Sequence, residues 1–394
     1  MKPTDRQVAM CDALTSVFSS QFGDADRLGF VIAPGRVNLL GEHTDHNDGF
    51  VLPMTVDRGV YVASRERKDD RIRVYSRRFD ESIDYRLSRP PATVPGDWRC
   101  YVVGVIEELR QRGFMDRGVD AVIDGDLDLG AGLSSSAALE VAVAMAMEQL
   151  GGFEIGAVET ASLCQTVEHR YAEVLCGIMD QFASRLGRPG HALHLDCRSL
   201  EYRHVPLSLG AYRIVVVESG VSRALADSAY NERRADCRRA LDYFKTVDPG
   251  IGALRDVTPE LLAEHERSLD NASFRRCRHV ITENRRVEQA IDYLERGDLE
   301  AFGCLVSASH QSLAQDYAVS CPELDWLVAT ANATDGVLGS RMTGAGFGGC
   351  TVSIAHVEAV DALAARIGSG YADRFGRQAR IFVLEANIEA GSIL

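Results

Sequence analysis

The segment that most constrains the fold of this chain is a short apolar strand followed by a glycine-rich turn and a long helix. Ala121 to Asp124 is predicted to be the strand, and Ala137 to Leu150 the helix. Between them the glycines let backbone amides converge, and serines stand where the helix begins. Free amides at a helix N-terminus bind phosphate without a lysine, because the helix dipole favours negative charge. The pattern predicts a phosphate-binding loop from Gly130 to Ser136, with a plain helix cap as the alternative.

Other phosphate-binding and nucleophile motifs do not fit this loop. The only lysines, Lys2, Lys68 and Lys245, lie outside the glycine-rich segments, so a Walker A loop is absent. The dinucleotide fingerprint lacks its third glycine, because Ser135 stands in that place, and there is no G-x-S-x-G elbow. The loop therefore favours neither a Rossmann domain nor a serine hydrolase.

A second glycine pattern lies near the end of the sequence, in RMTGAGFGGC. Gly344, Gly346 and Gly349 match G-x-G-x-x-G, but the residues that follow, Thr351 to Ile354, are predicted to form a strand. A nucleotide fingerprint needs a helix there. The pattern instead predicts a tight turn between two strands that lies close to a ligand or to another part of the backbone.

The length of 394 residues exceeds what one hydrophobic core usually serves, so two domains are expected. An apolar fraction of 46%, with 25% charged residues, is typical of a soluble globular protein. Apolar runs predict a strand from Phe30 to Ala33 that ends at Pro34-Gly35, a helix from Trp98 to Gln111 and a strand from Tyr212 to Glu218. Helices and strands alternate without an internal repeat, which predicts a two-lobed α+β fold. The turn-forming stretch Pro206 to Gly210 places the boundary between domains 1–208 and 209–394.

Several classes of protein are disfavoured by composition. Polar and acidic residues interrupt the first twenty positions, and apolar runs such as Ile214 to Val217 are too short to cross a bilayer, so a cytoplasmic protein without a membrane partner is expected. The 10 cysteines are scattered singly, against a disulfide framework or a zinc site. A net charge of −14 disfavours nucleic acid. Any ATP site must therefore rely on local donors and a metal ion.

Hydrogen-bond acceptors crowd the turn between Gly41 and Gly49, a pattern that suits sugar hydroxyls. The residues concerned are Glu42, His43, Asp45, His46 and Asp48. A divalent-metal site on the two histidines is one alternative, although no third ligand stands at a familiar spacing. A solvated acidic loop is the other.

Asp180, in LCGIMDQFAS, is flanked by Ile178, Met179 and Phe182. Such apolar neighbours desolvate a carboxylate and make it a stronger base, which suits proton abstraction. An aspartate that caps the next helix is the alternative.

Several blocks together resemble one family. PGRVNLLGEHTDHNDGFVLP from Pro34 to Pro53, GAGLSSSAALE, CGIMDQF and RMTGAGFGGC are similar, in this order, to the signatures of galactokinases within the GHMP small-molecule kinases. SGVSRALADSAYNERRADC from Ser219 and the segment Thr282 to Arg286 are also similar to galactokinase segments. The resemblance covers nearly the whole chain. It implies a two-lobed GHMP-kinase-like fold with ATP and sugar bound between the lobes.

The resemblance also implies roles for individual residues. The ATP phosphates would be wrapped by Gly130, Ala131, Gly132, Leu133, Ser134, Ser135 and Ser136, and Mg²⁺ would be held by Ser136 and Glu168. The sugar would be held by Glu42, His43 and Asp45 with Thr44 between them, by Tyr230 on the far side of the ring and by the backbone of Gly177. Asp45 would bind the axial 4-hydroxyl, which separates galactose from glucose.

The implied reaction transfers the γ-phosphate of ATP to the anomeric 1-hydroxyl of α-D-galactose, the first committed step of galactose catabolism. Asp180 would act as base or orienting acceptor, and Arg36 would stabilise charge on the transferring phosphoryl group. The two side chains are expected to pair, which keeps the carboxylate ionised despite its apolar neighbours. No obligate protein partner is implied.

The sequence departs from the family pattern at a few positions. His46 stands where a tyrosine is usual, Leu40 where isoleucine is frequent, and IFVLEANIEAGSIL is unlike the usual final segment. Two alternatives therefore stay open: a related kinase for N-acetylgalactosamine or arabinose, and a sensor that binds galactose and ATP without transfer. A yeast sensor related to galactokinases lacks two residues after its serine run, whereas Ala137 and Ala138 are present here.

Overall fold

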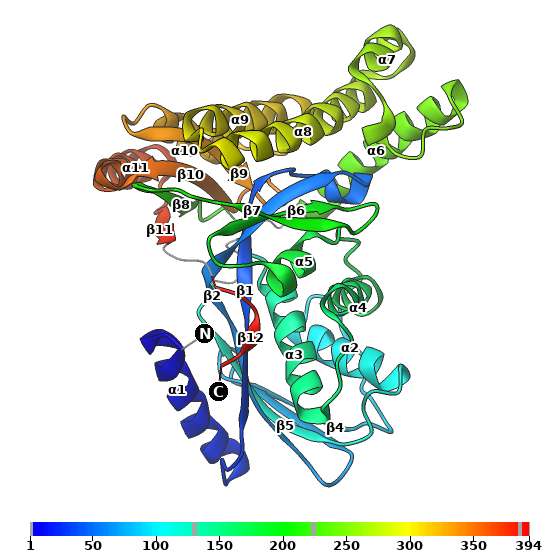
Figure 1. The fold of residues 1–394 in the computed structure, drawn as a ribbon, viewed down its shortest axis with the longest axis vertical. Coiled ribbons are helices and arrows are strands. Elements are labelled where there is room, and N and C mark those ends of the chain that lie inside the picture. Colours follow the sequence, from blue (N-terminus) through cyan, green and yellow to red (C-terminus); the bar gives the residue numbers. More distant parts are fainter. Residues whose placement is uncertain (1–2, 128–131, 222–225, 385–387, 394) are drawn as a thin grey trace.

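The computed structural model describes residues 3–127, 132–221, 226–384 and 388–393. Gly130 and Ala131 of the expected phosphate loop lie outside these ranges. Within them the chain forms two β-sheets with helices packed on their faces (Figure 1). The predicted α+β class is confirmed. None of the helices in the described ranges is long and apolar enough to span a bilayer.

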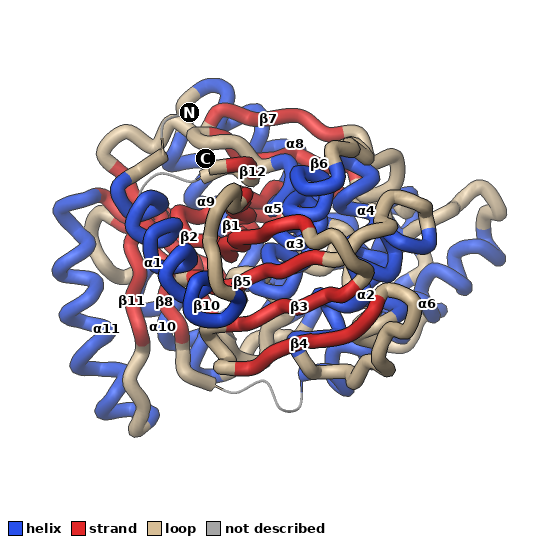
Figure 2. Tube along the Cα trace, turned by 90° about the horizontal axis from the view of Figure 1, so that it is seen from below, coloured by secondary structure: helices blue, strands red, loops and turns tan. Residues whose placement is uncertain are grey.

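The first sheet has eight strands, and its main path runs β12-β1-β2-β5-β3-β4, with β6 pairing with β2 and β7 pairing with β6 (Figure 2). Its strands are β1 (Gly29–Leu40), β2 (Phe50–Glu66), β3 (Arg71–Ser76), β4 (Glu81–Arg86), β5 (Val119–Gly125), β6 (His191–Asp196), β7 (Tyr202–Pro206) and β12 (Gly391–Ser392). The long antiparallel pair β1 and β2 extends from this sheet to the second lobe (Figure 1).

Strand β1 was expected to end at Pro34-Gly35 but continues to Leu40. The register against β2 shifts between Pro34 and Arg36, as at a β-bulge. A side chain at Gly35 would place its Cβ 2.6 Å from the carbonyl oxygen of Leu133, and the Arg36 amide donates to that oxygen at 3.1 Å. The bulge therefore brings β1 against the loop that precedes α3.

Helices cover both faces of the first sheet. Helix α1 (Asp5–Phe22) packs on one face, and the other face carries α2 (Trp98–Gln111), α3 (Ser135–Gly151), α4 (Ala157–Arg170) and α5 (Met179–Leu186) (Figure 1). Along β1, Phe30 and Ile32 pack with Phe18 of α1, while Val31 and Ala33 join the main core on the opposite face. Because both faces are buried, Phe30 to Ala33 form an unbroken apolar run within this strand.

The second sheet has four strands in the order β11-β8-β10-β9. They are β8 (Tyr212–Glu218), β9 (Val337–Thr343), β10 (Cys350–His356) and β11 (Arg380–Leu384). The helices of this half are α6 (Ala226–Val247), α7 (Pro259–Glu264), α8 (Asn271–Arg296), α9 (Leu299–Ser312), α10 (Pro322–Asn332) and α11 (Val360–Phe375). Val215 and Val217 of β8 pack in one core with residues of α10 and α11, and Ile214 and Val216 join the main core instead.

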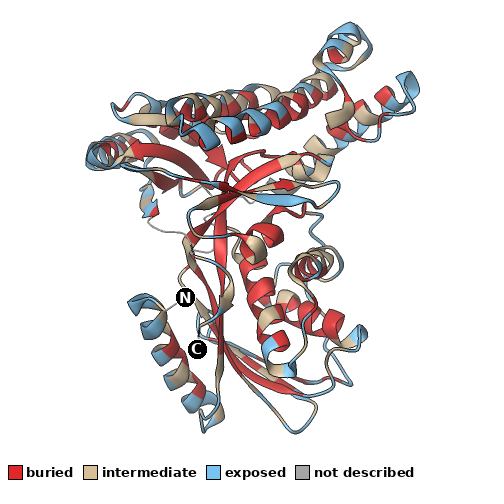
Figure 3. Cartoon of the chain, viewed as in Figure 1, coloured by how far each residue is buried: buried red, intermediate tan, exposed pale blue. Residues whose placement is uncertain are grey.

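One hydrophobic core links the two lobes. Leu39 of β1, Ile291 of α8 and Val216 of β8 belong to the same cluster, and buried residues run continuously through the middle of the molecule (Figure 3). Strands β1 to β7 precede the predicted boundary between residues 208 and 209 and belong to the first sheet, and β8 to β11 follow it and form the second sheet. Strand β12 also follows the boundary but belongs to the first sheet. The exact domain boundary stays a prediction.

Candidate active site

A cavity of about 180 Å³ between the lobes brings together most of the residues expected to act on the sugar. The predicted residues that line it are Arg36, Glu42, His43, Asp45, Gly177, Asp180 and Tyr230. They come from β1 and the turn after it, from the start of α5, and from α6. Gly344 and Ala345, in the turn between β9 and β10, complete the wall together with Val174, Cys176 and Met179. The second glycine pattern is therefore a turn between strands beside the cavity, as predicted.

Arg36 and Asp180 form a two-pronged ion pair in this cavity. Arg36 Nε donates to Asp180 Oδ1 and Nη2 donates to Oδ2, each at 2.8 Å, and Nη1 donates to the carbonyl oxygen of Gly132 at 2.7 Å. The hydroxyl of Ser134 also donates to Asp180 Oδ2. The expected pairing is thus present, and it joins the cavity to the described end of the expected phosphate loop.

The position of Asp180 argues against a capping role. Helix α5 begins after Ile178, whose side chain makes no capping bond, and Asp180 is the second residue of the helix. Its carboxylate is used by Arg36 and Ser134, and its side chain is 31% exposed, so a ligand can reach it. The nearby helix N-terminus favours the negative charge.

Asp45 lies in the single-turn helix Asp45–Asn47 and faces Gly177. A Cβ at Gly177 would collide with Asp45 Oδ2, so only glycine fits there. Burial acts to raise the pKa of Asp45, but the hydrogen bond with His46 Nδ1, at 3.2 Å, holds this pKa below its ordinary value. Asp45 is therefore an ionised acceptor in the cavity wall.

His43 offers an unused hydrogen-bonding group. Its ring stacks on Tyr317 with centroids 4.5 Å apart, and burial lowers its pKa well below the ordinary value, so the imidazole is neutral. Its Nε2 is buried and has no hydrogen-bond partner within the described residues. Since buried polar atoms are almost always paired in proteins, a ligand hydroxyl is a fitting partner.

Tyr230 and Glu42 complete the polar wall. The Tyr230 hydroxyl lies 3.2 Å from His46 Nδ1, and burial raises the pKa of this phenol well above its ordinary value, so it stays protonated. Burial likewise raises the pKa of Glu42, against the opposing charges of Arg341 and Arg36. The Glu42 carboxylate is bound by Arg341 and by the backbone amide of Gly344.

Thr44 is the one expected sugar-binding residue that the structure directs elsewhere. It is fully buried, and its hydroxyl lies 2.8 Å from the carbonyl oxygen of Gly41 and 2.7 Å from that of Phe50. Both oxygens are acceptors, so the hydroxyl's one proton is committed to them. Thr44 therefore holds the turn in shape, and its assignment as a sugar-binding residue stays a prediction.

The turn is anchored from the other lobe by residues to which the sequence analysis assigned no role. Glu283 Oε1 accepts from the Gly41 amide at 3.0 Å, and Asn284 Oδ1 accepts from the Phe50 amide at 2.6 Å. His279 Nε2 donates to the Glu42 carbonyl oxygen at 3.0 Å. His279 and Glu283 are four residues apart on α8, so they share one helix face. That spacing of polar residues on a buried face was the available signal.

Ser136 and Glu168 lie together, as the expected magnesium ligands should. The Ser136 hydroxyl is hydrogen-bonded to the Glu168 carboxyl, and burial raises the pKa of that carboxyl to about 7. A hydroxyl and a carboxylate are oxygen ligands that a hard cation prefers. A divalent cation beside Glu168 would hold it ionised, so the residues present fit the ion.

The two histidines of the turn do not build a metal centre of their own. In the described part of the chain, no group of three or more His, Cys, Asp or Glu side chains is arranged to hold a metal ion. Mg²⁺ does not require such a group, because it keeps several waters and binds through one or two protein ligands plus substrate phosphates.

A larger cavity of about 760 Å³ opens beside the N-terminus of α3. Its walls include Ser135, Ser136 and Leu139 of α3, and Phe79 and Trp98 opposite them. The rings of Phe79 and Trp98 stack with centroids 5.6 Å apart and planes 6° from parallel. This aromatic wall was not predicted; the signal was the tryptophan that opens a helix next to a turn-rich segment.

Fold and site together define a GHMP-type small-molecule kinase, and comparisons with known proteins agree. The GHMP kinase N-terminal domain model matches residues 100–188 and the C-terminal model residues 290–373. A mevalonate kinase of Methanococcus jannaschii, 18% identical, has the same fold with a TM-score of 0.65, over 91% of this chain and 98% of that one.

Relatives with higher sequence identity show which family of GHMP kinases the chain belongs to. The galactokinase galactose-binding signature matches residues 16–66. A galactokinase of Roseiflexus is 45% identical over 92% of this chain and 93% of its own, and one of Bacillus subtilis is 40% identical over 95% and 97%. The crystal structure of Lactococcus lactis galactokinase complexed with galactose is 36% identical, with a TM-score of 0.93 over 97% of this chain and 99% of that one. The chain belongs to the galactokinase family, as predicted.

Proposed function

We propose that this protein is a galactokinase that transfers the γ-phosphate of ATP to the 1-hydroxyl of α-D-galactose, giving galactose 1-phosphate and ADP. The observation that carries the proposal is the Arg36–Asp180 pair, which faces the sugar cavity on one side and bonds to Gly132 and Ser134 on the other. The acceptor and the donor of the phosphoryl group would meet at this pair.

The cavity wall supplies the contacts that a hexose needs. Ionised Asp45 accepts from the axial 4-hydroxyl, and the free Nε2 of His43 bonds a neighbouring hydroxyl. Tyr230 closes the far side of the ring, and the backbone of Gly177 lies beside it. Glucose places its 4-hydroxyl equatorially and would leave buried Asp45 unpaired, which costs on the order of 10⁴ in kcat/KM.

The phosphates of ATP lie along the loop from Gly130 to Ser136, of which Gly132 to Ser136 are described here. The Gly130 and Ala131 contacts belong to this proposal by family resemblance alone. The stacked rings of Phe79 and Trp98, in the cavity next to Ser135 and Ser136, form a flat surface for the adenine base.

Transfer needs a deprotonated sugar oxygen and neutralisation of charge on the phosphoryl group. The 1-hydroxyl oxygen attacks the γ-phosphorus, the bond to the bridging oxygen of ADP breaks, and the hydroxyl proton passes to Asp180. Arg36 stabilises the negative charge on the phosphoryl oxygens. Ser136 and Glu168 would hold Mg²⁺, which would neutralise charge on the ATP phosphates when bound.

We place the protein in the cytoplasm. The reaction consumes ATP, and all 10 cysteines are free thiols, an arrangement typical of a reducing compartment.

Release of ADP, measured in a coupled assay with magnesium-ATP and a panel of aldoses, tests the proposal. Galactose should give the highest kcat/KM, with N-acetylgalactosamine, arabinose and glucose well below it. A preference for N-acetylgalactosamine or arabinose would identify that sugar, rather than galactose, as the substrate. Binding of galactose and ATP without turnover on any sugar would identify the protein as a sensor.

A pair of variants makes the assay specific for the sugar cavity. Asp45→Asn should lose the preference for galactose over glucose, because the amide no longer offers a charged acceptor. The same exchange at Asp84, an exposed strand residue whose side chain is 45% exposed, should leave the preference unchanged.

A further inference from the structure

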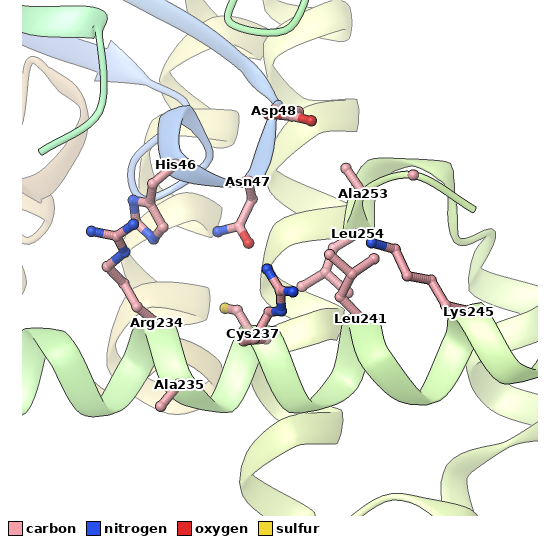
Figure 4. A pocket seen from close by; sticks show the side chains of 12 residues that line it. His46, Asn47, Asp48, Arg234, Ala235, Cys237, Leu241, Lys245, Ala253 and Leu254 are labelled. Carbon is pink, nitrogen blue, oxygen red and sulfur yellow. The ribbon is translucent and has the colours of Figure 1, made fainter. Parts of the chain in front are cut away.

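A second cavity, of about 470 Å³, lies on the other side of the sugar-binding turn. It is bounded by α6, by His46–Asp48 of the turn, and by Gly252–Leu254 (Figure 4). This volume is within the range of small-molecule sites. The functions described above make no use of this cavity.

Three cations of α6 line the cavity: Arg234, Arg238 and Lys245. Their spacings of four and seven residues place all of them on one face of the helix. Arg238 shares its charge with Asp242 at 3.0 Å, and Arg234 donates one guanidinium hydrogen to the carbonyl oxygen of Leu175, which leaves others available. Within the described ranges Lys245 has no ion-pair partner.

The positive charge of this lining contrasts with the rest of the protein. Asp48 is the one carboxylate among the lining residues, against three cations, whereas the whole chain carries a net charge of −14. A concave site of one sign concentrates ligands of the opposite sign. The cavity therefore selects a small anion.

His46 lines this cavity and contacts two residues that line the sugar cavity, Asp45 and Tyr230. Its side chain is only 3% exposed, and its Nδ1 lies 3.2 Å from both Asp45 Oδ1 and the Tyr230 hydroxyl. Its Nε2 lies 3.1 Å from the Tyr317 hydroxyl. Figure 4 shows the guanidinium of Arg234 next to the His46 ring. A ligand on Arg234 would thus change the surroundings of the residue that positions Asp45.

We propose that this second cavity binds a sugar phosphate, meaning a phosphate monoester on a small hydroxylated body, and that its occupancy alters galactose affinity through His46. The cations of α6 hold the phosphate. Asp48 and the side-chain amide of Asn47 offer an acceptor and a donor to hydroxyl groups. A nucleotide is disfavoured, because the lining contains no Phe, Tyr or Trp on which a base could stack.

Isothermal titration calorimetry on protein saturated with galactose tests the site. Glucose 6-phosphate and galactose 6-phosphate, which are not products of the reaction, are the probes, with inorganic phosphate and free glucose as comparisons. At least one of the two esters should bind, and more tightly than inorganic phosphate. No heat from either ester, or equal affinity for inorganic phosphate, overturns the assignment.

The double variant Arg238→Glu/Lys245→Glu reverses two exposed charges and should weaken ester binding at least tenfold. Lys68→Glu, at an exposed lysine in the bend between β2 and β3, is the matched control and should bind as the parent does. Unchanged binding in the double variant, checked for native stability by thermal melting, contradicts the location of the site.

The KM for galactose measures the proposed coupling between the second cavity and the sugar cavity. At saturating ester the KM for galactose should shift at least twofold in the parent protein and should stay constant in the double variant. A constant KM in the parent rules out the coupling. Binding is measured by heat rather than by turnover, so its failure is distinct from a failure of the kinase assignment.

Discussion

Two arginine–carboxylate pairs border the same cavity, and they differ in their access to solvent. In the Arg36–Asp180 pair, the carboxylate is 31% exposed and all its partners belong to the first lobe. In the Arg341–Glu42 pair, the side chains are 0% and 4% exposed, and the bond joins the second sheet to the turn after β1. The first pair is open to a substrate, while the second holds one lobe against the other.

The difference follows from what surrounds each guanidinium. Arg341 donates to the carbonyl oxygens of Leu39 and Met342, at 3.0 and 2.8 Å, and lies 3.8 Å from a carboxylate oxygen of Glu283. Protein groups therefore surround the guanidinium of Arg341 on every side. Arg36 and Asp180 keep one side toward the cavity, so their charges remain available to reacting groups. Two pairs of the same chemical type therefore differ in role: the exposed pair is available to a substrate, and the buried pair stabilises the fold.

The largest effect is expected at the open pair. Asp180→Asn should keep galactose affinity, because the amide preserves size, but lower kcat by about 10³ through loss of the base. Rapid-quench measurement of galactose 1-phosphate, together with calorimetric galactose binding, checks both parts. Near-normal turnover would reduce Asp180 to an orienting residue.

At the buried pair the expected loss is in stability. Arg341→Met leaves the carboxylates of Glu42 and Glu283 without this cation, so the free energy of unfolding should fall by about 3–5 kcal/mol. Urea denaturation measures this loss. Arg71→Met, which breaks a pair with side chains 47% and 45% exposed, should cost far less, because water screens an exposed pair. Equal losses in the two variants would remove the distinction between the pairs.

Acid should weaken the buried region through His279. Its Nε2 donates to Glu42 and its Nδ1 accepts from Ser312, and burial lowers its pKa from 6.5 to about 4. The unfolded chain therefore binds more protons between these values. The stabilising contribution is complete above pH 6.5 and is lost as pH falls toward 4, by roughly 3 kcal/mol.

His279→Gln removes this titration, so its unfolding free energy should fall less between pH 7 and 4.5 than that of the parent. Parallel curves for the two proteins, measured by urea denaturation at each pH, would contradict the assignment of the acid sensitivity to His279.

The smallest effect is expected at the sugar wall. Gly177→Ala places a methyl group against Asp45 and should raise the KM for galactose about tenfold, with kcat changed far less, because the reacting pair is untouched. Steady-state kinetics measures both constants. The same exchange at Gly368 of α11, an exposed position where a Cβ meets nothing within 4 Å and φ is not positive, is the matched control and should leave this KM unchanged.

Sequence patterns predicted the bounds of helices and strands well where the pattern of buried residues is regular along the element. Helix α2 and strand β8 have the expected bounds, Trp98–Gln111 and Tyr212–Glu218. Strand β1 was missed beyond Pro34, because a bulge lets a strand continue past a proline and glycine that normally end it. Sequence periodicity does not register a bulge.

The site was predicted to the extent that the family signatures mark it. The signatures placed Arg36 with Asp180 and gathered His43 and Asp45, and the structure brings these residues to one cavity. They did not distinguish Thr44, whose hydroxyl bonds to the backbone of its own turn. Arg341 and Glu283 lie within the signature blocks, but their roles were not predicted, because their partners lie hundreds of residues away, where no local pattern reaches.

Strand β12 has a consequence for how the protein is made. It pairs with β1 through Val31 with Ser392 and Ile32 with Gly391. One edge of an early strand is therefore covered only by residues near the end of the described chain. Because translation proceeds from the N-terminus, the edge of β1 stays open until the ribosome has released residues 391 and 392. An open strand edge recruits other strands. The nascent protein is therefore exposed to self-association at this edge until β12 pairs with β1 and covers it.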